Sequence, residues 1–137
     1  YQEAQYIVSS NKIMENIILV GRVPYISLKT YQEIASIIVC PDKMHPFSNM
    51  VPHIKYFDSL ASGKIVINGS FDSITELNED ERISVNFKPS NILDLSEKIE
   101  KCLDNDQFYT ERFKNNERFV YENFTYNKYL DNDNQSY

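Results

Sequence analysis

Short apolar runs recur along the chain at spacings that suit the strands of a single sheet. Ile17–Val20, Ile37–Cys40 and Ile65–Ile67 are unbroken apolar runs, whereas Ile83–Phe87 alternates apolar and polar residues. Unbroken runs are typical of parallel strands covered on both faces, and alternation is typical of an edge strand with one face in solvent. These four segments are the predicted strands.

Helical periodicity occupies the segments between and after the predicted strands. The first residues look like the end of a helix, a helix starts at Ile26, and a short helical segment covers residues 71–77. The clearest helix follows Pro89, with one apolar stripe. Its apolar positions are Ile92, Leu95, Ile99, Cys102 and Leu103. A last helix is predicted over residues 107–122. Strands that alternate with helices predict an α/β fold with a largely parallel sheet.

The stretch Pro41–Gly69 links two of the predicted strands and is the centre of the functional argument. It holds a polar loop and a helix-sized segment that Pro52 can open and Gly63 can close. Strand, loop, helix and strand in this order form a βαβ crossover, which places the loop at the carboxyl end of the first strand. Ligands bind at that edge in open α/β sheets.

Asp58 lies at the border of the apolar stripe expected on the helix in this stretch. The stripe would bury one set of residues and leave another on the polar side. The buried set is Ile54, Phe57, Leu60 and Ala61, and the polar set is Lys55, Ser59 and Ser62. A carboxylate at the border can reach the crevice and accept a hydrogen bond from a ribose hydroxyl. Spacing alone favours the simpler interpretation, a surface ion pair between Lys55 and Asp58.

The start of the same helix is a candidate anion site. Pro52 at the first helical position has no amide hydrogen, so the amides of Val51, His53 and Ile54 would point out of the helix. Such amides, together with the helix dipole, attract phosphate.

Composition and charge exclude several classes of protein. At 137 residues and a net charge of −6, with no basic cluster, the chain is predicted to be one domain that does not bind nucleic acid. The two cysteines, Cys40 and Cys102, fall in apolar patterns and are predicted to be free buried thiols of a reducing compartment. No apolar run is long enough for a membrane span and no signal-peptide pattern opens the chain, so we expect a cytoplasmic protein. Residues 131–137 are polar and are expected to be disordered.

Other site signatures are missing from the sequence. Asp42, His45 and His53 match no standard zinc spacing, so no metal site is predicted and the two histidines are expected on the surface. The glycine-rich fingerprints of dinucleotide-binding sites and of P-loops are both missing. The G-x-S-x-G motif that holds the nucleophile of α/β-hydrolases is missing as well.

Two segments carry a resemblance to a known family. Asn16–Tyr25, and above all Pro52–Ile67 with Lys55, Asp58 and Gly63 in order, resemble the C-terminal, nucleotide-sugar-binding half of retaining "group 1" GT-B glycosyltransferases. The similarity continues to the Asn-Phe-Thr-Tyr sequence at 123–126, so it covers nearly the whole chain from residue 16. It implies a Rossmann-like parallel sheet with helices on both faces, as an incomplete C-terminal half of a GT-B fold.

The resemblance also implies roles for individual residues. Asp58 matches the second of two family glutamates spaced eight residues apart, which approaches the donor's ribose. The backbone around Gly21, Arg22 and Val23 matches the turn beside the nucleotide base, and Lys55 would supply positive charge near the diphosphate. The first glutamate, which approaches the donor sugar, falls at Met50, which is a departure from the family.

The implied activity is transfer of a sugar from a nucleotide-diphosphate sugar to a glycan, lipid-linked or other acceptor, without a cofactor or metal. The usual setting of the family is surface polysaccharide or glycoconjugate synthesis. The family's N-terminal acceptor-binding half and its phosphate-binding Arg/Lys pair are not among these residues, so the chain alone is expected to be inactive. Peripheral membrane association of the full-length protein stays open. The alternative is an α/β domain that keeps the fold, has lost donor binding, and acts as an interaction or structural module. Met50 favours this alternative; Lys55 with Asp58 favours the enzyme.

Overall fold

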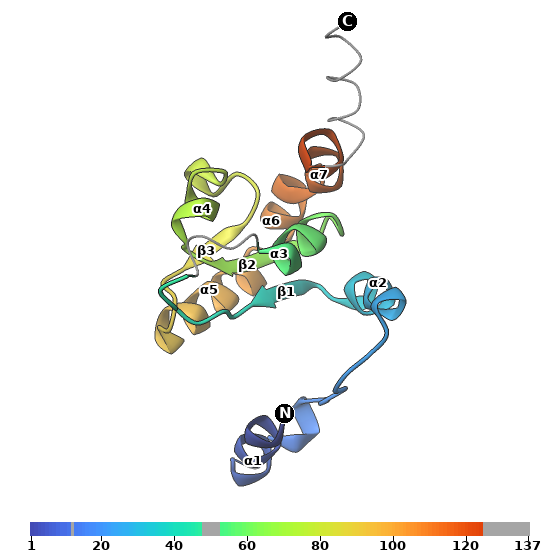
Figure 1. The fold of residues 1–137 in the computed structure, drawn as a ribbon, viewed down its shortest axis with the longest axis vertical. Coiled ribbons are helices and arrows are strands. Elements are labelled where there is room, and N and C mark those ends of the chain that lie inside the picture. The colour runs from blue at the N-terminus through green and yellow to red at the C-terminus, as the bar shows by residue number, and fades with distance from the viewer. Residues whose placement is uncertain (12, 48–52, 125–137) are drawn as a thin grey trace, which may run out of the picture. The chain divides into compact units, whose positions relative to one another are not determined.

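The computed structural model describes residues 1–11, 13–47 and 53–124. They fall into two compact units, Tyr1–Tyr31 and Gln32–Tyr137, the second of which holds the sheet (Figure 1). The predicted disordered tail at 131–137 lies outside the described residues.

The first unit contains helix α1 (Gln2–Ser10), a 3-10 turn η1 (Met14–Asn16) and most of helix α2 (Tyr25–Ile34). The helix predicted from Ile26 is therefore confirmed. The strand predicted at Ile17–Val20 is wrong: the segment joins no sheet, and Ile18 is 89% exposed. An apolar run becomes a strand only when another strand pairs with it, and periodicity carries no information about that partner.

The second unit is built on a three-stranded parallel sheet in the order β1-β2-β3. The strands are β1 (Ile37–Cys40), β2 (Ile65–Gly69) and β3 (Val85–Phe87), as the apolar runs predict. Helix α3 (Ile54–Leu60) crosses between β1 and β2, and Gly63 adopts the left-handed φ of 68° that ends the crossover helix. Helix α4 (Asp72–Thr75) and a 3-10 turn η2 (Glu79–Glu81) precede β3.

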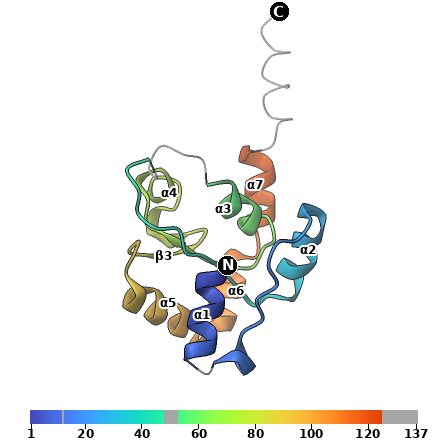
Figure 2. The same cartoon turned by 60° about the horizontal axis from the view of Figure 1, so that its bottom comes forward.

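Helices cover both faces of the sheet, so the predicted α/β class is confirmed (Figures 1 and 2). One core joins α3, α4 and α7 (Asn116–Phe124) to Cys40 and Val66. The other joins α5 (Ile92–Asp104) and α6 (Asp106–Phe113) to the opposite side chains of β2 and β3. Because successive side chains of a strand point to opposite faces, each face of β2 is committed to one of these cores.

The predicted burial of α3 is wrong at Ile54 and Ser59. The buried face of α3 consists of Tyr56, Ser59 and Leu60, and the predicted stripe residue Ile54 is 69% exposed. Tyr56 can be buried because its hydroxyl bonds to Ser84 Oγ at 2.8 Å, and Ser59 because its hydroxyl donates to the Lys55 carbonyl at 2.7 Å. Burial raises the pKa of Tyr56 to about 12, although its bond to Ser84 opposes this.

β3 lies at the edge of the sheet, as predicted, but its polar face is not in solvent. Ser84 is fully buried and Asn86 half-buried. Asn78 covers them: its Nδ2 donates to Ser84 O, Ser84 Oγ and Asn86 Oδ1, and its Oδ1 accepts from the amides of Ile83 and Ser84. A strand whose polar side chains are buried in a hydrogen-bonded network shows the same apolar–polar alternation as a strand with one face in solvent. The sequence pattern therefore does not distinguish a buried polar face from a solvated one.

The last predicted helix, residues 107–122, is two helices. It breaks between α6 and α7 just before Asn116, whose buried side chain donates to the Ile83 carbonyl at 2.6 Å. The break therefore allows Asn116 to pair with a backbone carbonyl just before β3.

The two cysteines are free and buried, as predicted, with Cys40 6% and Cys102 0% exposed. Burial is the largest cause that raises the pKa of both thiols. We expect iodoacetamide to alkylate both at least about a hundredfold more slowly in the native protein than in guanidinium chloride, which corresponds to local opening free energies of about 3 kcal/mol. Mass spectrometry of time points gives the rates. Fast native labelling of Cys40 would contradict its placement under α3.

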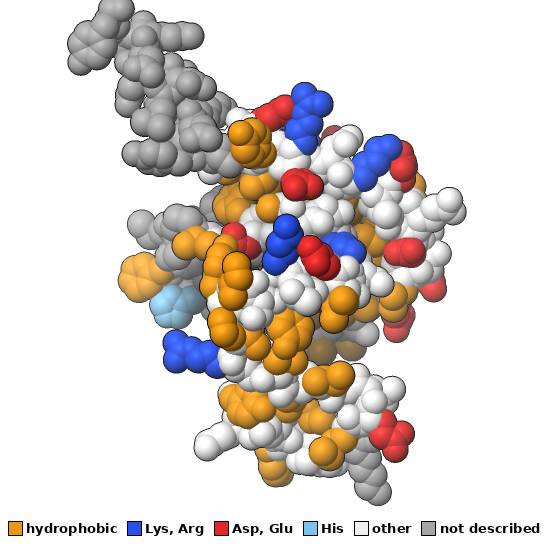
Figure 3. Space-filling model, turned by 90° about the vertical axis from the view of Figure 1, so that its right-hand side faces the viewer, with side chains coloured by type: hydrophobic (Ala, Val, Ile, Leu, Met, Phe, Trp, Pro, Cys, Tyr) orange, Lys and Arg blue, Asp and Glu red, His pale blue; other side chains and the backbone are white. Residues whose placement is uncertain are grey.

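On the face shown in Figure 3, most basic side chains lie beside acidic ones, and several acidic side chains have no basic neighbour. This arrangement agrees with the predicted lack of nucleic-acid binding, which stays a prediction. In the described part of the chain, no helix is long and apolar enough to cross a bilayer.

Candidate functional site

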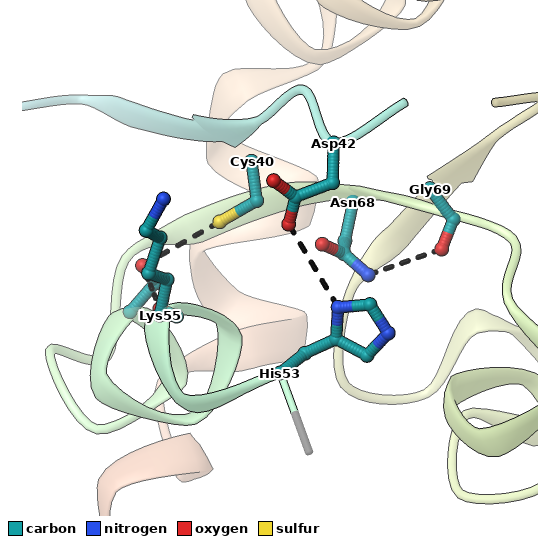
Figure 4. A network of polar contacts seen from close by, with 7 residues as sticks. Cys40, Asp42, His53, Lys55, Asn68 and Gly69 are labelled. Carbon is teal, nitrogen blue, oxygen red and sulfur yellow. Dashed lines mark hydrogen bonds and ion pairs between the residues drawn. The ribbon is translucent and has the colours of Figure 1, made fainter. Parts of the chain in front are cut away.

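The carboxyl ends of the strands bring polar groups from distant parts of the sequence to one edge. Cys40 of β1 is in register with Asn68 of β2, and Asn68 is in register with Asn86 of β3. Register partners in a parallel sheet point to the same face, so these three side chains form a row across the sheet on the side of α3. Asp42 follows β1 and His53 precedes α3 at the same edge (Figure 4).

Cys40 lies between two opposite charges at this edge. Its thiol is 3.7 Å from Ser59 Oγ, and either atom can be the donor of this bond. Burial raises the pKa of Cys40, the bond to Ser59 lowers it, Asp42 raises it and Lys55 lowers it. Both charges are thus within electrostatic range of the end of β1. The thiol itself stays protonated near neutral pH, so it is no candidate nucleophile.

His53 is held by two neighbours. Its Nδ1 lies 3.7 Å from Asp42 Oδ2, and its ring stacks on Phe71 with centroids 4.6 Å apart and planes 18° apart. The side chain of His53 is 9% exposed and that of Asp42 is 41% exposed. The prediction that His53 is a surface residue is therefore wrong, whereas His45 is exposed. The stacking and the carboxylate together fix the orientation of the imidazole.

Asn68 closes the site on the side of β2. It is 0% exposed, its Nδ2 donates to Gly69 O at 3.0 Å, and its Oδ1 has no hydrogen-bond partner in the part of the chain that the structure describes. Gly69 is required beside it, because a Cβ there would lie 2.7 Å from the Phe71 ring. Asn68 was not identified from the sequence; the available signal was an amide side chain at the end of the apolar run Ile65–Ile67, followed directly by glycine.

The predicted phosphate and ribose contacts fall on one element. Lys55 is exposed on the first turn of α3, and Asp58 is half-buried one turn later, as its border position suggests. The amides of His53 and Ile54 lie at the start of this helix, which has seven residues, so its dipole extends over two turns only. Val51, Pro52 and Met50 lie outside the described residues.

The predicted base contacts belong to the other unit. Gly21 has a φ of 77° and packs against the ring of Tyr1, and Gly21 and Arg22 line an open groove within Tyr1–Tyr31. Val23 follows in the extended link to α2. The role of these residues at the nucleotide base stays a prediction.

Among the described residues, no group of three or more His, Cys, Asp or Glu side chains is arranged to hold a metal ion. Asp42 Oδ2 and His53 Nδ1 do lie 3.7 Å apart, but they form no cluster of three with His45. Chemically, the described residues offer a cation at Lys55, carboxylates at Asp42 and Asp58, and, at Asn68, an amide oxygen without a partner among them. These groups suit a ligand with both anionic and hydroxyl groups.

Comparisons with known proteins support the fold. No protein-family model and no curated protein matches the sequence. Among solved structures, sucrose-phosphate synthase from Thermosynechococcus elongatus superposes with a TM-score of 0.80 at 18% sequence identity, over 98% of this chain and 32% of that protein. The chain thus spans about a third of that neighbour's length. The likeness shows a Rossmann-like α/β fold of the kind that forms half of a GT-B enzyme.

Proposed function

We propose that this chain is the donor-binding half of a glycosyltransferase that uses a nucleotide-diphosphate sugar. The observation that carries the proposal is the fold likeness to sucrose-phosphate synthase over almost the entire chain. The order of Lys55, Asp58 and Gly63 in the crossover, which resembles the C-terminal half of group 1 GT-B enzymes, supports it independently. Fold alone does not determine function, so the proposal rests on the two together.

Each predicted site residue has a role in this proposal. Asp58 accepts a hydrogen bond from the ribose, and Lys55 with the amides of Val51, His53 and Ile54 faces the diphosphate. Gly21, Arg22 and Val23 border the base. During transfer, the bond between the sugar's anomeric carbon and the diphosphate oxygen breaks, an acceptor hydroxyl oxygen bonds to that carbon, and the hydroxyl proton passes to the departing diphosphate. Positive charge at Lys55 stabilises the charge that grows on the leaving diphosphate.

The proposed enzyme is the full-length protein, with an acceptor-binding half beyond these residues and no metal or cofactor. We place it in the cytoplasm, in the synthesis of a polysaccharide or glycoconjugate. Met50 favours a second candidate function, an interaction or structural domain without donor binding, because the resemblance assigns the donor-sugar contact to that position.

Nucleotide titration separates the two candidates. In isothermal titration calorimetry of the full-length protein with UDP, GDP, UDP-glucose and GDP-mannose, we expect at least one nucleotide to bind. Asp58→Ala should weaken that binding about tenfold, because a hydrogen bond to a charged group is lost. Lys55→Ala should weaken the binding of diphosphates more than that of the nucleoside.

Glu97→Ala is the matched control, since Glu97 is an exposed carboxylate on α5, which covers the opposite face of the sheet. Its affinity should equal that of the wild type. Absence of binding by every nucleotide, or equal affinity in Asp58→Ala and the wild type, would leave the interaction domain as the better description.

A further inference from the structure

Among the described residues, a buried acceptor without a hydrogen-bond partner lies at the edge where the donor is proposed to bind. Asn68 Oδ1 is such an atom, and within the described residues Ser73 Oγ is the other buried side-chain atom of this kind. A serine hydroxyl can rotate toward a partner, but an amide oxygen only accepts. The Asn68 side chain is also oriented, because its Nδ2 donates to Gly69 O at 3.0 Å. Its oxygen is therefore a fixed acceptor for a donor that a ligand could bring.

Asn68 belongs to a continuous cluster with Asp42 and His53. Cys40, the register partner of Asn68, lies two residues before Asp42, which pairs with His53 at 3.7 Å. His53 stacks on Phe71, whose ring packs directly against Gly69, the neighbour of Asn68. Figure 4 shows the three side chains directed toward one another from the ends of β1 and β2 and the start of α3.

The chemistry of the cluster favours a neutral ligand rich in hydroxyl groups. Asp42 offers a carboxylate that is 41% exposed, and Asn68 offers an amide oxygen. Asp42 would repel a phosphate placed directly against its carboxylate, and a metal ion would find too few ligands, since the described residues include no cluster of three metal-binding side chains. Hydroxyl groups donate to both kinds of oxygen, and a sugar presents several of them at adjacent carbons.

We propose that Asp42 and Asn68 accept hydrogen bonds from hydroxyl groups of the donor's sugar, and that His53 is a positioning residue that holds Asp42. This inference rests on the proposed donor-binding function and names the part of the site that selects the sugar. In a chain with methionine at position 50, Asp42 supplies a carboxylate just after the end of β1. Solvent reaches the cluster at Asp42, which is 41% exposed, whereas Asn68 is 0% exposed, so the proposed bond to Asn68 requires the groups that cover it to move.

The test measures the contribution of the sugar separately from that of the nucleotide. Calorimetry gives the affinity of the full-length protein for UDP and GDP and for a panel of their sugars: UDP-glucose, UDP-galactose, UDP-N-acetylglucosamine and GDP-mannose. We expect one sugar nucleotide to bind more tightly than its own nucleoside diphosphate. Asp42→Ala and Asn68→Ala should each reduce this ratio about fivefold to tenfold and leave the affinity for the diphosphate within twofold.

Glu97→Gln on the opposite face should leave both affinities unchanged. Asn68 is buried, so its variant requires a check of folding by circular dichroism, whereas Asp42 is partly exposed and its variant is informative even if Asn68→Ala does not fold. An unchanged ratio in Asp42→Ala, or equal wild-type affinities for diphosphates and sugar nucleotides, would overturn this inference alone. Failure of every diphosphate to bind the wild type would overturn the proposed function, and this inference with it.

Discussion

Phe113→Ala is expected to lower the free energy of unfolding by about 4 kcal/mol, because it removes a buried aromatic ring and leaves a cavity. Phe113 ends α6, is 0% exposed and stacks on Tyr109 with centroids 5.8 Å apart. It lies in the core that joins α5 and α6 to β2 and β3. The neighbouring side chains cannot move far enough to fill the cavity, because they belong to strands and helices that are held by other contacts. Urea denaturation followed by circular dichroism measures the change.

Phe108→Ala is the matched control on the same helix. Phe108 is 59% exposed and contacts the edge of Tyr109 and the guanidinium of Arg112. Its loss should lower the free energy of unfolding by about 1 kcal/mol or less. Equal losses at the two positions would show that α6 does not pack on the sheet in the described orientation.

Asn78→Ala is expected to lower the free energy of unfolding by about 3 kcal/mol. The substitution leaves the amides of Ile83 and Ser84 without the oxygen that accepts from both, in a region where Ser84 is fully buried. Each buried donor left unpaired costs about 1–3 kcal/mol. The Ser84 and Asn86 side-chain oxygens lose a donor as well. Thermal unfolding and urea denaturation give the change independently.

The control for this prediction is Asn115→Ala, at an exposed asparagine on the segment between α6 and α7. Its effect should stay within about 0.5 kcal/mol. Asn78→Asp adds a second comparison, because it keeps an acceptor for the two amides but removes the Nδ2 donor. A loss at Asn78→Ala no larger than at Asn115→Ala would contradict the role of Asn78 as the centre of the buried network.

The elements that the sequence predicts correctly are those whose partners are close in the chain. β1, α3 and β2 form one crossover, and Gly63 ends its helix at a left-handed φ, so local signals determine the unit. The segment Ile17–Val20 has the same apolar character as β1, but its conformation depends on a partner strand that the pattern does not specify. Periodicity therefore identifies segments that can form strands, but it does not show which of them pair with a neighbouring strand.

The candidate site was predicted only in part, for a related reason. Lys55 and Asp58 share one helix, so spacing and resemblance could select them from the sequence. Asp42, His53 and Asn68 come from three elements, and only the register of β1 against β2 and the stack of His53 on Phe71 bring them together. From the sequence, Asp42 and His53 were considered together only as metal ligands, an interpretation that their spacing did not support. His53 was also selected for its backbone amide, and Asn68 was not identified.

The buried Asn78 network has a consequence for how β3 is aligned. The strand has three residues, and a slip by one residue would exchange the sides of Val85 and Asn86, which would turn an amide toward the core that contains Phe113. Asn78 distinguishes the two alignments, because its amide group pairs with both Ser84 and Asn86 only in the observed one. The side chain of Asn78 thus determines the register of β3 against β2, in addition to stabilising this edge of the sheet.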